Sequence, residues 1–218
     1  MPDIEELLAL TSALHDHLCP RQVLGVRTGL LAARLFALDL PQADKRIFAF
    51  VETDGCYSDG LSVATGCWHG RRTLRLVDYG KVAATLVDTH TNDAFRITPQ
   101  PAARDLACMQ AHDAPDRWHA QLAAYQVMPD RDLLRAERVV LNVSMQAVIS
   151  RPGLRVVCSV CGEEIMNERE VSHDGQLLCR HCAGVEPYYP PEPYYSVDAT
   201  CGSLDLDRLH TAEQVGNA

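Results

Sequence analysis

RIFAFVETDGCYSDGLSVATGC, residues 46–67, joins two hydrophobic patterns through one short turn. Its first part, 46–53, is a run of apolar residues rich in β-branched and aromatic side chains, which predicts a buried strand. Asp54-Gly55 favours a turn, and SDGLSVATG at 58–66 predicts a short helix. The stretch therefore predicts a strand that leads directly into a helix.

Cysteines flank this predicted helix on both sides. Ser58 or Asp59 is expected to be its N-cap, and Gly66 is expected to stop it at the C-terminal end. Cys56 follows the strand, and Cys67 follows Gly66. Two thiols are therefore placed at the two ends of one short helix.

The chain before this stretch predicts two helices separated at a proline. Apolar residues recur at helical spacing over residues 3–18, and a second helix is expected to begin at Pro20, with Cys19 as its N-cap. The apolar positions of the second helix are Val23, Val26, Leu30, Leu31 and Leu35. In the first helix, one turn would bring His15 and Cys19 together.

The chain after this stretch mixes strands and helices without regular alternation. TLRLVDYGKVAATLVD predicts two strands joined by a Tyr79-Gly80 turn, and 94–98 predicts a third. Residues 99–138 are helical in pattern, and ERVVLNVSMQAVIS at 137–150 predicts a strand. This order predicts an α+β main domain over residues 1–150, with helices packed on a mixed or antiparallel sheet.

Composition and charge exclude several classes of protein. The 218-residue chain has a formal net charge of -9, which argues against a broad nucleic-acid-binding surface, and against a regulator that binds nucleic acid through a zinc finger. No apolar stretch is long enough to cross a membrane, and the N-terminus is acidic where a signal peptide would be basic, so we expect a cytoplasmic protein. Its nine cysteines therefore indicate metal ligation or reactive thiols more than disulfides.

CSVC and CRHC form a Cys-x2-Cys-x17-Cys-x2-Cys array that is typical of structural zinc sites. Two such knuckles can give zinc a closed tetrahedral shell of four thiolates, and a pair of redox dithiols is the alternative. The pattern predicts a small zinc-ribbon or treble-clef-like module over residues 155–184. A Pro/Tyr-rich tail at 185–218 follows and offers aromatic rings for docking partner proteins. The four cysteines are Cys158, Cys161, Cys179 and Cys182.

HDHLCP, residues 15–20, is the second candidate site. Cys19 at a helix N-terminus would see free amide hydrogens and the positive end of the helix dipole, both of which favour a thiolate. The alternative is that these cysteines are small core residues and that the histidines simply end a helix. The residues that could form this site are His15, His17, Cys19, Cys56, Asp59 and Cys67.

HDHLCP, followed by DGCYSDGLSVATGCWHGRRTL and GKVAATL, resembles the family of FmdE-like proteins, which takes its name from the FmdE component of formylmethanofuran dehydrogenase. Asp16 and Arg21 stand where this family often has glycine. The resemblance implies that residues of both motifs line a site that is catalytic, metal-binding or both. His17, Cys19, Cys56 and Asp59 are the implied catalytic residues, and His15, His17, Cys19, Cys56 and Cys67 the implied ligands of a second transition metal.

Two functions remain open at this point. The first is a metal- or thiolate-dependent enzyme, or accessory component in one-carbon or redox metabolism, which acts on a small molecule and works with redox-complex partner proteins. The second is a non-catalytic metal-handling or assembly module. We also expect a homodimer, in which Cys67 either serves a site on the other chain or is a buried bystander.

Overall fold

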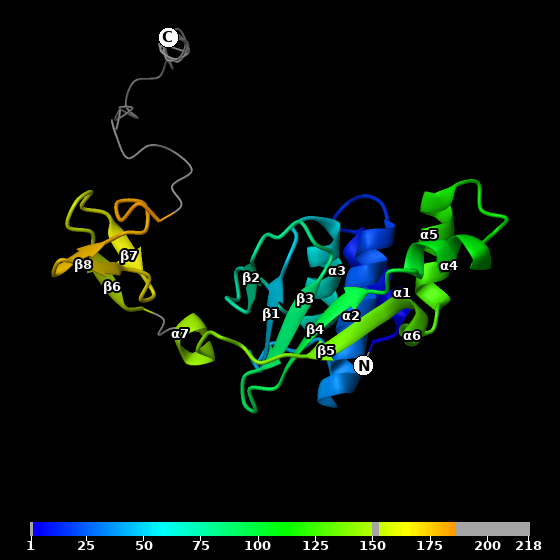
Figure 1. Ribbon diagram of the computed structural model, residues 1–218, viewed down its shortest axis with the longest axis horizontal. Helices are drawn as coiled ribbons and strands as arrows, with labels where there is room; N and C mark the ends of the chain where they lie inside the picture. Colours follow the sequence, from blue (N-terminus) through cyan, green and yellow to red (C-terminus); the bar gives the residue numbers. More distant parts are fainter. Residues whose placement is uncertain (1, 150–152, 186–218) are drawn as a thin grey trace, which may run out of the picture. The chain divides into compact units, whose positions relative to one another are not determined.

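The computed structural model describes residues 2–149 and 153–185. The chain divides into two compact units, Met1–Ile149 and Ser150–Ala218 (Figure 1). The Pro/Tyr-rich tail predicted over 185–218 lies, after Val185, outside the described residues.

The larger unit contains a five-stranded mixed sheet in the order β2-β1-β3-β4-β5. β2 runs parallel to β1, and the other neighbouring strands are antiparallel. This arrangement confirms an α+β fold with a mixed sheet. The strands are β1 (Ile47–Val51), β2 (Leu74–Leu76), β3 (Ala84–Asp88), β4 (Ala94–Pro99) and β5 (Leu134–Arg138).

β2 and β3 form as strands near their predicted positions, but they lie on opposite sides of β1 and do not pair with each other. The loop between them wraps around the end of β1. Backbone N–H groups of Tyr79 and Lys81 both donate to the Glu52 carbonyl, and that of Val77 donates to the Val51 carbonyl. These bonds satisfy the end of β1 and carry the chain across it.

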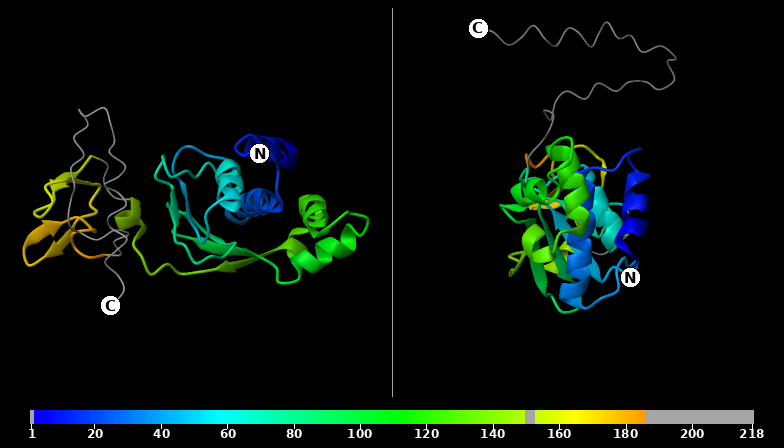
Figure 2. Two further views of the ribbon diagram at one scale, coloured as in Figure 1. Left: turned by 90° about the horizontal axis from the view of Figure 1, so that it is seen from above. Right: turned by 90° about the vertical axis from the view of Figure 1, so that its right-hand side faces the viewer.

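Helices α1, α2 and α3 cover one face of the sheet (Figure 2). Strand residues on one face of the sheet, such as the paired Ala49 and Leu86, lie in the main hydrophobic core. Leu7, Val23 and Leu61 of these helices belong to the same core. The helices are α1 (Ile4–Ser12), α2 (Pro20–Phe36), α3 (Cys56–Thr65), α4 (Ala103–Gln110), α5 (Arg117–Val127), α6 (Asp130–Leu133) and α7 (Met145–Ile149).

The predicted helix over residues 3–18 is wrong in its second half, because α1 ends at Ser12. Residues 13–16 form turns, residues 17–19 are outside any helix, and Asp16 has a left-handed backbone with φ of 59°. A right-handed helix cannot continue through such a residue. His15 and Cys19 are therefore not brought together by a helical turn.

The strand predicted over 137–150 is also wrong, because β5 ends at Arg138 and α7 follows at Met145–Ile149. The purely helical pattern predicted over 99–138 is wrong at its end, because β5 begins at Leu134. After Arg138 the chain folds over the second face of the sheet. There Val139 and Val148 pack with Phe48, Val87 and Met145, so the alternating apolar residues cover a sheet face instead of joining it.

The smaller unit consists of two short antiparallel hairpins and a small core that includes the cysteines. Its strands are β6 (Arg155–Val157), β7 (Glu164–Met166), β8 (Val171–His173) and β9 (Gln176–Leu178). In the described part of the chain, no helix has the length and apolar character needed to span a membrane.

Candidate functional site

Two glycines allow α2 and α3 to pack so closely that their backbones are in contact. A Cβ atom on Gly25 would lie 2.2 Å from the Tyr57 carbonyl oxygen, and one on Gly60 would lie 2.2 Å from the Gln22 carbonyl oxygen. Real Cβ atoms do not approach backbone oxygens so closely, so only glycine fits at either position. The close packing sets the N-terminal ends of the two helices beside each other.

A cysteine stands at each of these helix N-termini. Cys19 is the N-cap of α2, as predicted, and Pro20 is the first helical residue. Cys56 is the first residue of α3, whose N-cap is Gly55, so the predicted caps Ser58 and Asp59 are wrong. Gly55 has φ of 75°, a conformation that suits glycine and starts the helix earlier than the polar residues suggested.

Gln22 fixes the loop that carries Cys19. Its side-chain Oε1 accepts a 2.7 Å hydrogen bond from the Cys19 backbone N–H, and its Nε2 donates to the Thr11 carbonyl at 3.0 Å. Gln22 is fully buried, so both bonds are shielded from water. The loop after α1 is thereby tied to the first turn of α2.

Cys19 lies close enough to Cys56 to influence the ionisation of the Cys56 thiol. Burial and the adjacent Cys19 thiol raise the pKa of Cys56 above its ordinary value, while the positive charge of Arg21 acts in the opposite direction. Two thiols that share a site cannot both ionise easily, because the second negative charge repels the first. A cation bound between them would remove this repulsion.

Two histidines and an aspartate lie close to Cys19 and Cys56 along the chain. His15 Nε2 donates to Asp59 Oδ2 at 2.6 Å, and His17 Nδ1 donates to the His15 carbonyl at 2.8 Å. The Nε2 atom of His17 and the Nδ1 atom of His15 are then the nitrogens with lone pairs for a ligand. A carboxylate that orients an imidazole in this way is typical of metal-binding histidines.

Cys67 lies apart from this group, in the main hydrophobic core. Its thiol donates to the Ile47 carbonyl at 3.3 Å, and burial raises its pKa to about 11. Such a thiol stays protonated at neutral pH and is a poor ligand. The structure therefore favours the second of the two alternatives for Cys67, a buried bystander.

We expect Asp16 to tolerate glycine but not a β-branched residue. Its φ of 59° is accessible to glycine and to aspartate, and is costly for valine. Asp16→Val should lower the free energy of unfolding by about 1–2 kcal/mol, and Asp16→Gly should change it little. Denaturant unfolding followed by tryptophan fluorescence checks this, and equal losses in both variants would contradict it.

The four predicted cysteines of the smaller unit converge on one point. The sulfurs of Cys158, Cys161, Cys179 and Cys182 all lie within 4.8 Å of one another. Zinc–sulfur bonds of about 2.3 Å in a tetrahedron place sulfurs roughly 3.8 Å apart, and the Cys161 and Cys179 sulfurs are 4.0 Å apart. The cluster fits a zinc ion.

Backbone amides support a negative charge on this cluster. Burial alone would raise the pKa of Cys158, but N–H groups of Cys161, Cys179 and Val160 lower it to about 6. Burial and the three neighbouring thiols raise the pKa of Cys182 to about 12. Four thiolates at this spacing therefore require a bound cation.

Among the described residues, these four cysteines are the only group of three or more candidate ligand atoms that lie within 4.8 Å of one another. The Cys19–Cys56 pair offers two sulfurs, and a histidine would have to move to complete a third ligand. Two soft sulfur donors and an imidazole suit a transition metal.

Sequence reasoning missed the residues that hold the thiol pair in place. Gly25 and Gly60 stand at ordinary helical positions, and Gln22 is a polar residue in an apolar pattern. The one available signal was glycine inside a predicted helix. Glycine lowers the stability of a helix, so its presence there indicates a close contact that requires the absence of a side chain.

Two family models match the chain in separate segments. One, described as FmdE, Molybdenum formylmethanofuran dehydrogenase operon, matches residues 14–137. The other, described as Prokaryotic dksA/traR C4-type zinc finger, matches residues 152–188. The first match contains the Cys19–Cys56 pair, and the second contains the four-cysteine cluster.

A curated relative and a solved structure are similar to this chain. A probable S-adenosyl-L-methionine-binding protein of Archaeoglobus fulgidus is 36% identical over 87 residues, which are 38% of this chain and 24% of the relative. The chain thus spans about a quarter of that relative's length. The crystal structure of a tungsten formylmethanofuran dehydrogenase FmdE-like protein from Syntrophus aciditrophicus is 22% identical, with a TM-score of 0.51. The match covers 85% of this chain and 95% of that protein, and it supports the fold.

Proposed function

Because this chain belongs to the FmdE family, we propose that Cys19 and Cys56 hold a transition metal, which His17 or His15 helps to bind. This centre serves redox chemistry on a small molecule in one-carbon metabolism, in the protein alone or as part of a larger complex. The single observation that carries the proposal is that Cys19 and Cys56 stand at the N-terminal ends of two helices in backbone contact.

Each residue of the group has a role in this proposal. The two thiolates are the metal ligands, since sulfur binds soft transition metals strongly. The ends of α2 and α3 stabilise their negative charge through unpaired amides and the helix dipoles. Asp59 orients the His15 imidazole through their 2.6 Å hydrogen bond. A bound metal would supply Lewis-acid or electron-transfer chemistry at this point.

Elemental analysis of protein purified without oxygen tests the proposal. We expect a second metal beyond the zinc of the smaller unit, and we expect Cys19→Ala and Cys56→Ala to lose it, because each removes a sulfur ligand. Cys67→Ala is the matched control: it also removes one thiol, but one bonded to the Ile47 carbonyl in the core. The zinc of the four-cysteine cluster serves as an internal standard in every sample.

The same metal content in the wild type and in Cys19→Ala would contradict the metal centre. In that case, faster alkylation of the wild-type thiols than of Cys56→Ala would indicate a thiolate site without metal. Circular dichroism of each variant shows whether a lost metal reflects a lost ligand or a lost fold.

The separate zinc unit supports a second function, binding of partner proteins. Its exposed apolar residues, Leu154, Val157, Val160 and Met166, are available for such contacts. Truncation after Ile149 should then abolish partner capture while the first centre keeps its metal. The homodimer stays a prediction, and site sharing through Cys67 is not part of this proposal.

A further inference from the structure

A cavity of about 280 Å³ lies beside the N-terminus of α2. Pro20 and Arg21, which directly follow Cys19, form part of its wall. The remaining wall comes from Leu24 of α2, from Val82, and from residues at the end of β4, in α4 and in α5. The cavity has room for a molecule of roughly ten non-hydrogen atoms, at about 30 Å³ for each water-sized group.

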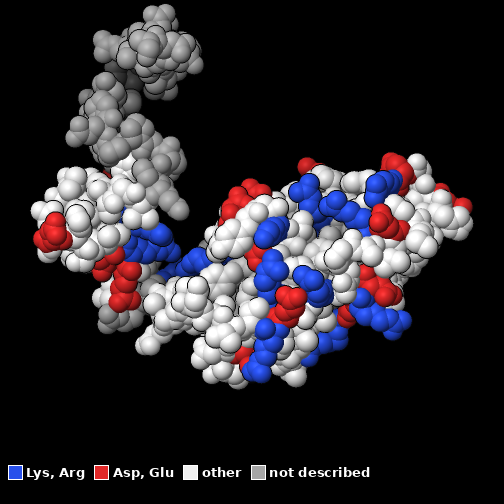
Figure 3. All heavy atoms as spheres, viewed as in Figure 1, with Lys and Arg blue, Asp and Glu red and all other residues white. Residues whose placement is uncertain are grey.

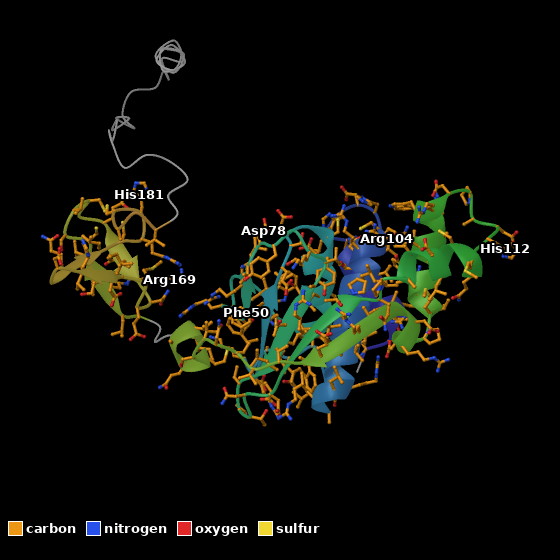
Figure 4. All side chains as sticks on the ribbon, viewed as in Figure 1. Phe50, Asp78, Arg104, His112, Arg169 and His181 are labelled. Atoms are coloured by element: carbon orange, nitrogen blue, oxygen red, sulfur yellow. The ribbon has the colours of Figure 1, made fainter. Side chains whose placement is uncertain are left out.

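The charged groups in the wall of this cavity are all positive. Arg21 and Arg104 line it, and its lining includes no aspartate or glutamate, although the chain as a whole has a net charge of -9. Figure 3 shows Lys and Arg side chains gathered around a hollow in the upper part of the larger unit. Figure 4 labels Arg104, at the start of α4.

Neither arginine has a carboxylate partner within 4.0 Å among residues 2–149 and 153–185. Most other arginines of the larger unit do: Arg96 pairs with Glu52, Arg46 with Asp88, and Arg138 with Asp93. Arg104 instead lies in the cavity wall together with Tyr125. Two guanidinium groups without a carboxylate in one cavity favour an anionic ligand, because each can donate two parallel hydrogen bonds to a carboxylate or phosphate.

The rest of the wall is largely apolar and is held rigidly. Pro20, Leu24, Val82 and Pro99 supply apolar surface. Tyr125 is held by Arg27 of α2, whose buried guanidinium donates to the carbonyls of Tyr125 and Met128 at 2.6 Å each. A preformed apolar wall stabilises the hydrocarbon part of a ligand, and fixed polar groups orient its charged end.

We propose that this cavity binds a small organic carboxylate, with Arg21 and Arg104 holding the carboxyl group and the apolar wall holding its carbon chain. The inference rests on the proposed function in one respect: the bound molecule is the substrate presented to the Cys19–Cys56 centre. Arg21 and Arg104 are thus substrate-binding residues.

Calorimetric titration of the full-length, zinc-loaded protein tests this inference with hexanoate as the probe. Hexanamide is its neutral counterpart, and inorganic phosphate tests for an anion without a carbon chain. We expect saturable binding of hexanoate. Hexanamide should bind at least about tenfold more weakly, since a hydrogen bond to a charged group contributes about 1.5–3 kcal/mol. Phosphate should also bind at least about tenfold more weakly, because it has no carbon chain to bury against the apolar wall.

Substitutions test whether hexanoate binds in this cavity. Arg21→Gln and Arg104→Gln should each weaken hexanoate binding about tenfold or more. Arg135→Gln should leave it unchanged, because this exposed arginine lies on β5 and pairs with Glu137. Unchanged affinity in both cavity variants, equal binding of hexanamide, tighter binding of phosphate, or no binding at all would overturn the inference.

Cys19→Ala separates this inference from the proposed function. This variant should bind hexanoate as the wild type does and lack the second metal. If hexanoate fails to bind while the second metal is present, the inference falls and the metal centre stands. If hexanoate binds but no second metal is found, the metal centre falls and the carboxylate site stands.

Discussion

Gly60→Ala should destabilise the larger unit by about 3 kcal/mol or more and should remove the second metal. The added methyl group would lie 2.2 Å from the Gln22 carbonyl oxygen and 3.1 Å from the Val26 nitrogen. Both atoms belong to the backbone of α2, so no side chain can move aside. The helices must separate, and Cys56 then moves away from Cys19.

Gly70→Ala is the matched control for this substitution. A Cβ at Gly70 would meet no atom within 4 Å, and its backbone does not require glycine. Both variants can be followed by tryptophan fluorescence, because Trp68 and Trp118, the two tryptophans of the chain, lie in the larger unit. Equal unfolding midpoints for the two variants would show that α2 and α3 do not depend on this contact.

Gly25→Ala should reproduce the effect from the other helix. Its Cβ would lie 2.2 Å from the Tyr57 carbonyl oxygen, one residue after Cys56. Since the two glycines face the same interface, their effects should not add, and the double variant should lose less than the sum of the single losses. Additive losses would indicate two independent contacts.

The sequence predicted the local elements of this fold better than their pairing. Pro20 after Cys19 gave the start of α2, and Gly66 gave the end of α3, because proline and glycine restrict the backbone directly. The position of β2 on the far side of β1 depends on bonds from Tyr79 and Lys81 to the Glu52 carbonyl. Backbone bonds of this kind leave no mark in the side-chain pattern.

The errors have separate physical causes. The apolar spacing of residues 3–18 suits a helix, yet Asp16 adopts a left-handed backbone, a conformation that aspartate tolerates better than most residues. The alternation over 137–150 is typical of a strand, yet these residues cover the second face of the sheet. The alternation of apolar residues indicates which side chains are buried, but it does not distinguish a strand within a sheet from a segment that packs on a sheet.

Some parts of the candidate site could be predicted from the sequence, and others could not. Motif spacing identified the four cysteines of the smaller unit, because zinc imposes that spacing on the chain. For Cys67 it left two alternatives, a site on the other chain or a buried bystander, because the burial of this thiol depends on the packing of the whole core. Arg104 is 85 positions after Cys19 in the chain, so no local motif connects it to the site.

Cys179→Ala should unfold the smaller unit and leave the larger one intact. The apolar core of the smaller unit has Ile165 and Leu178 as its buried members besides Cys158, which is too little to fold so short a segment. Zinc binding by four thiolates supplies about 10–16 kcal/mol in small modules. Loss of one sulfur ligand removes most of this free energy and leaves three cysteines whose thiolates would repel one another.

Limited proteolysis and tryptophan fluorescence measure the two units separately. Cleavage within residues 153–185 should become rapid in Cys179→Ala and in chelator-treated wild type. The free energy of unfolding measured by tryptophan fluorescence should change by less than about 0.5 kcal/mol, because both tryptophans lie in the other unit. Ser159→Ala is the control, since Ser159 lies exposed between Cys158 and Cys161. A metal-free smaller unit that still resists protease would show that its hairpins fold without zinc.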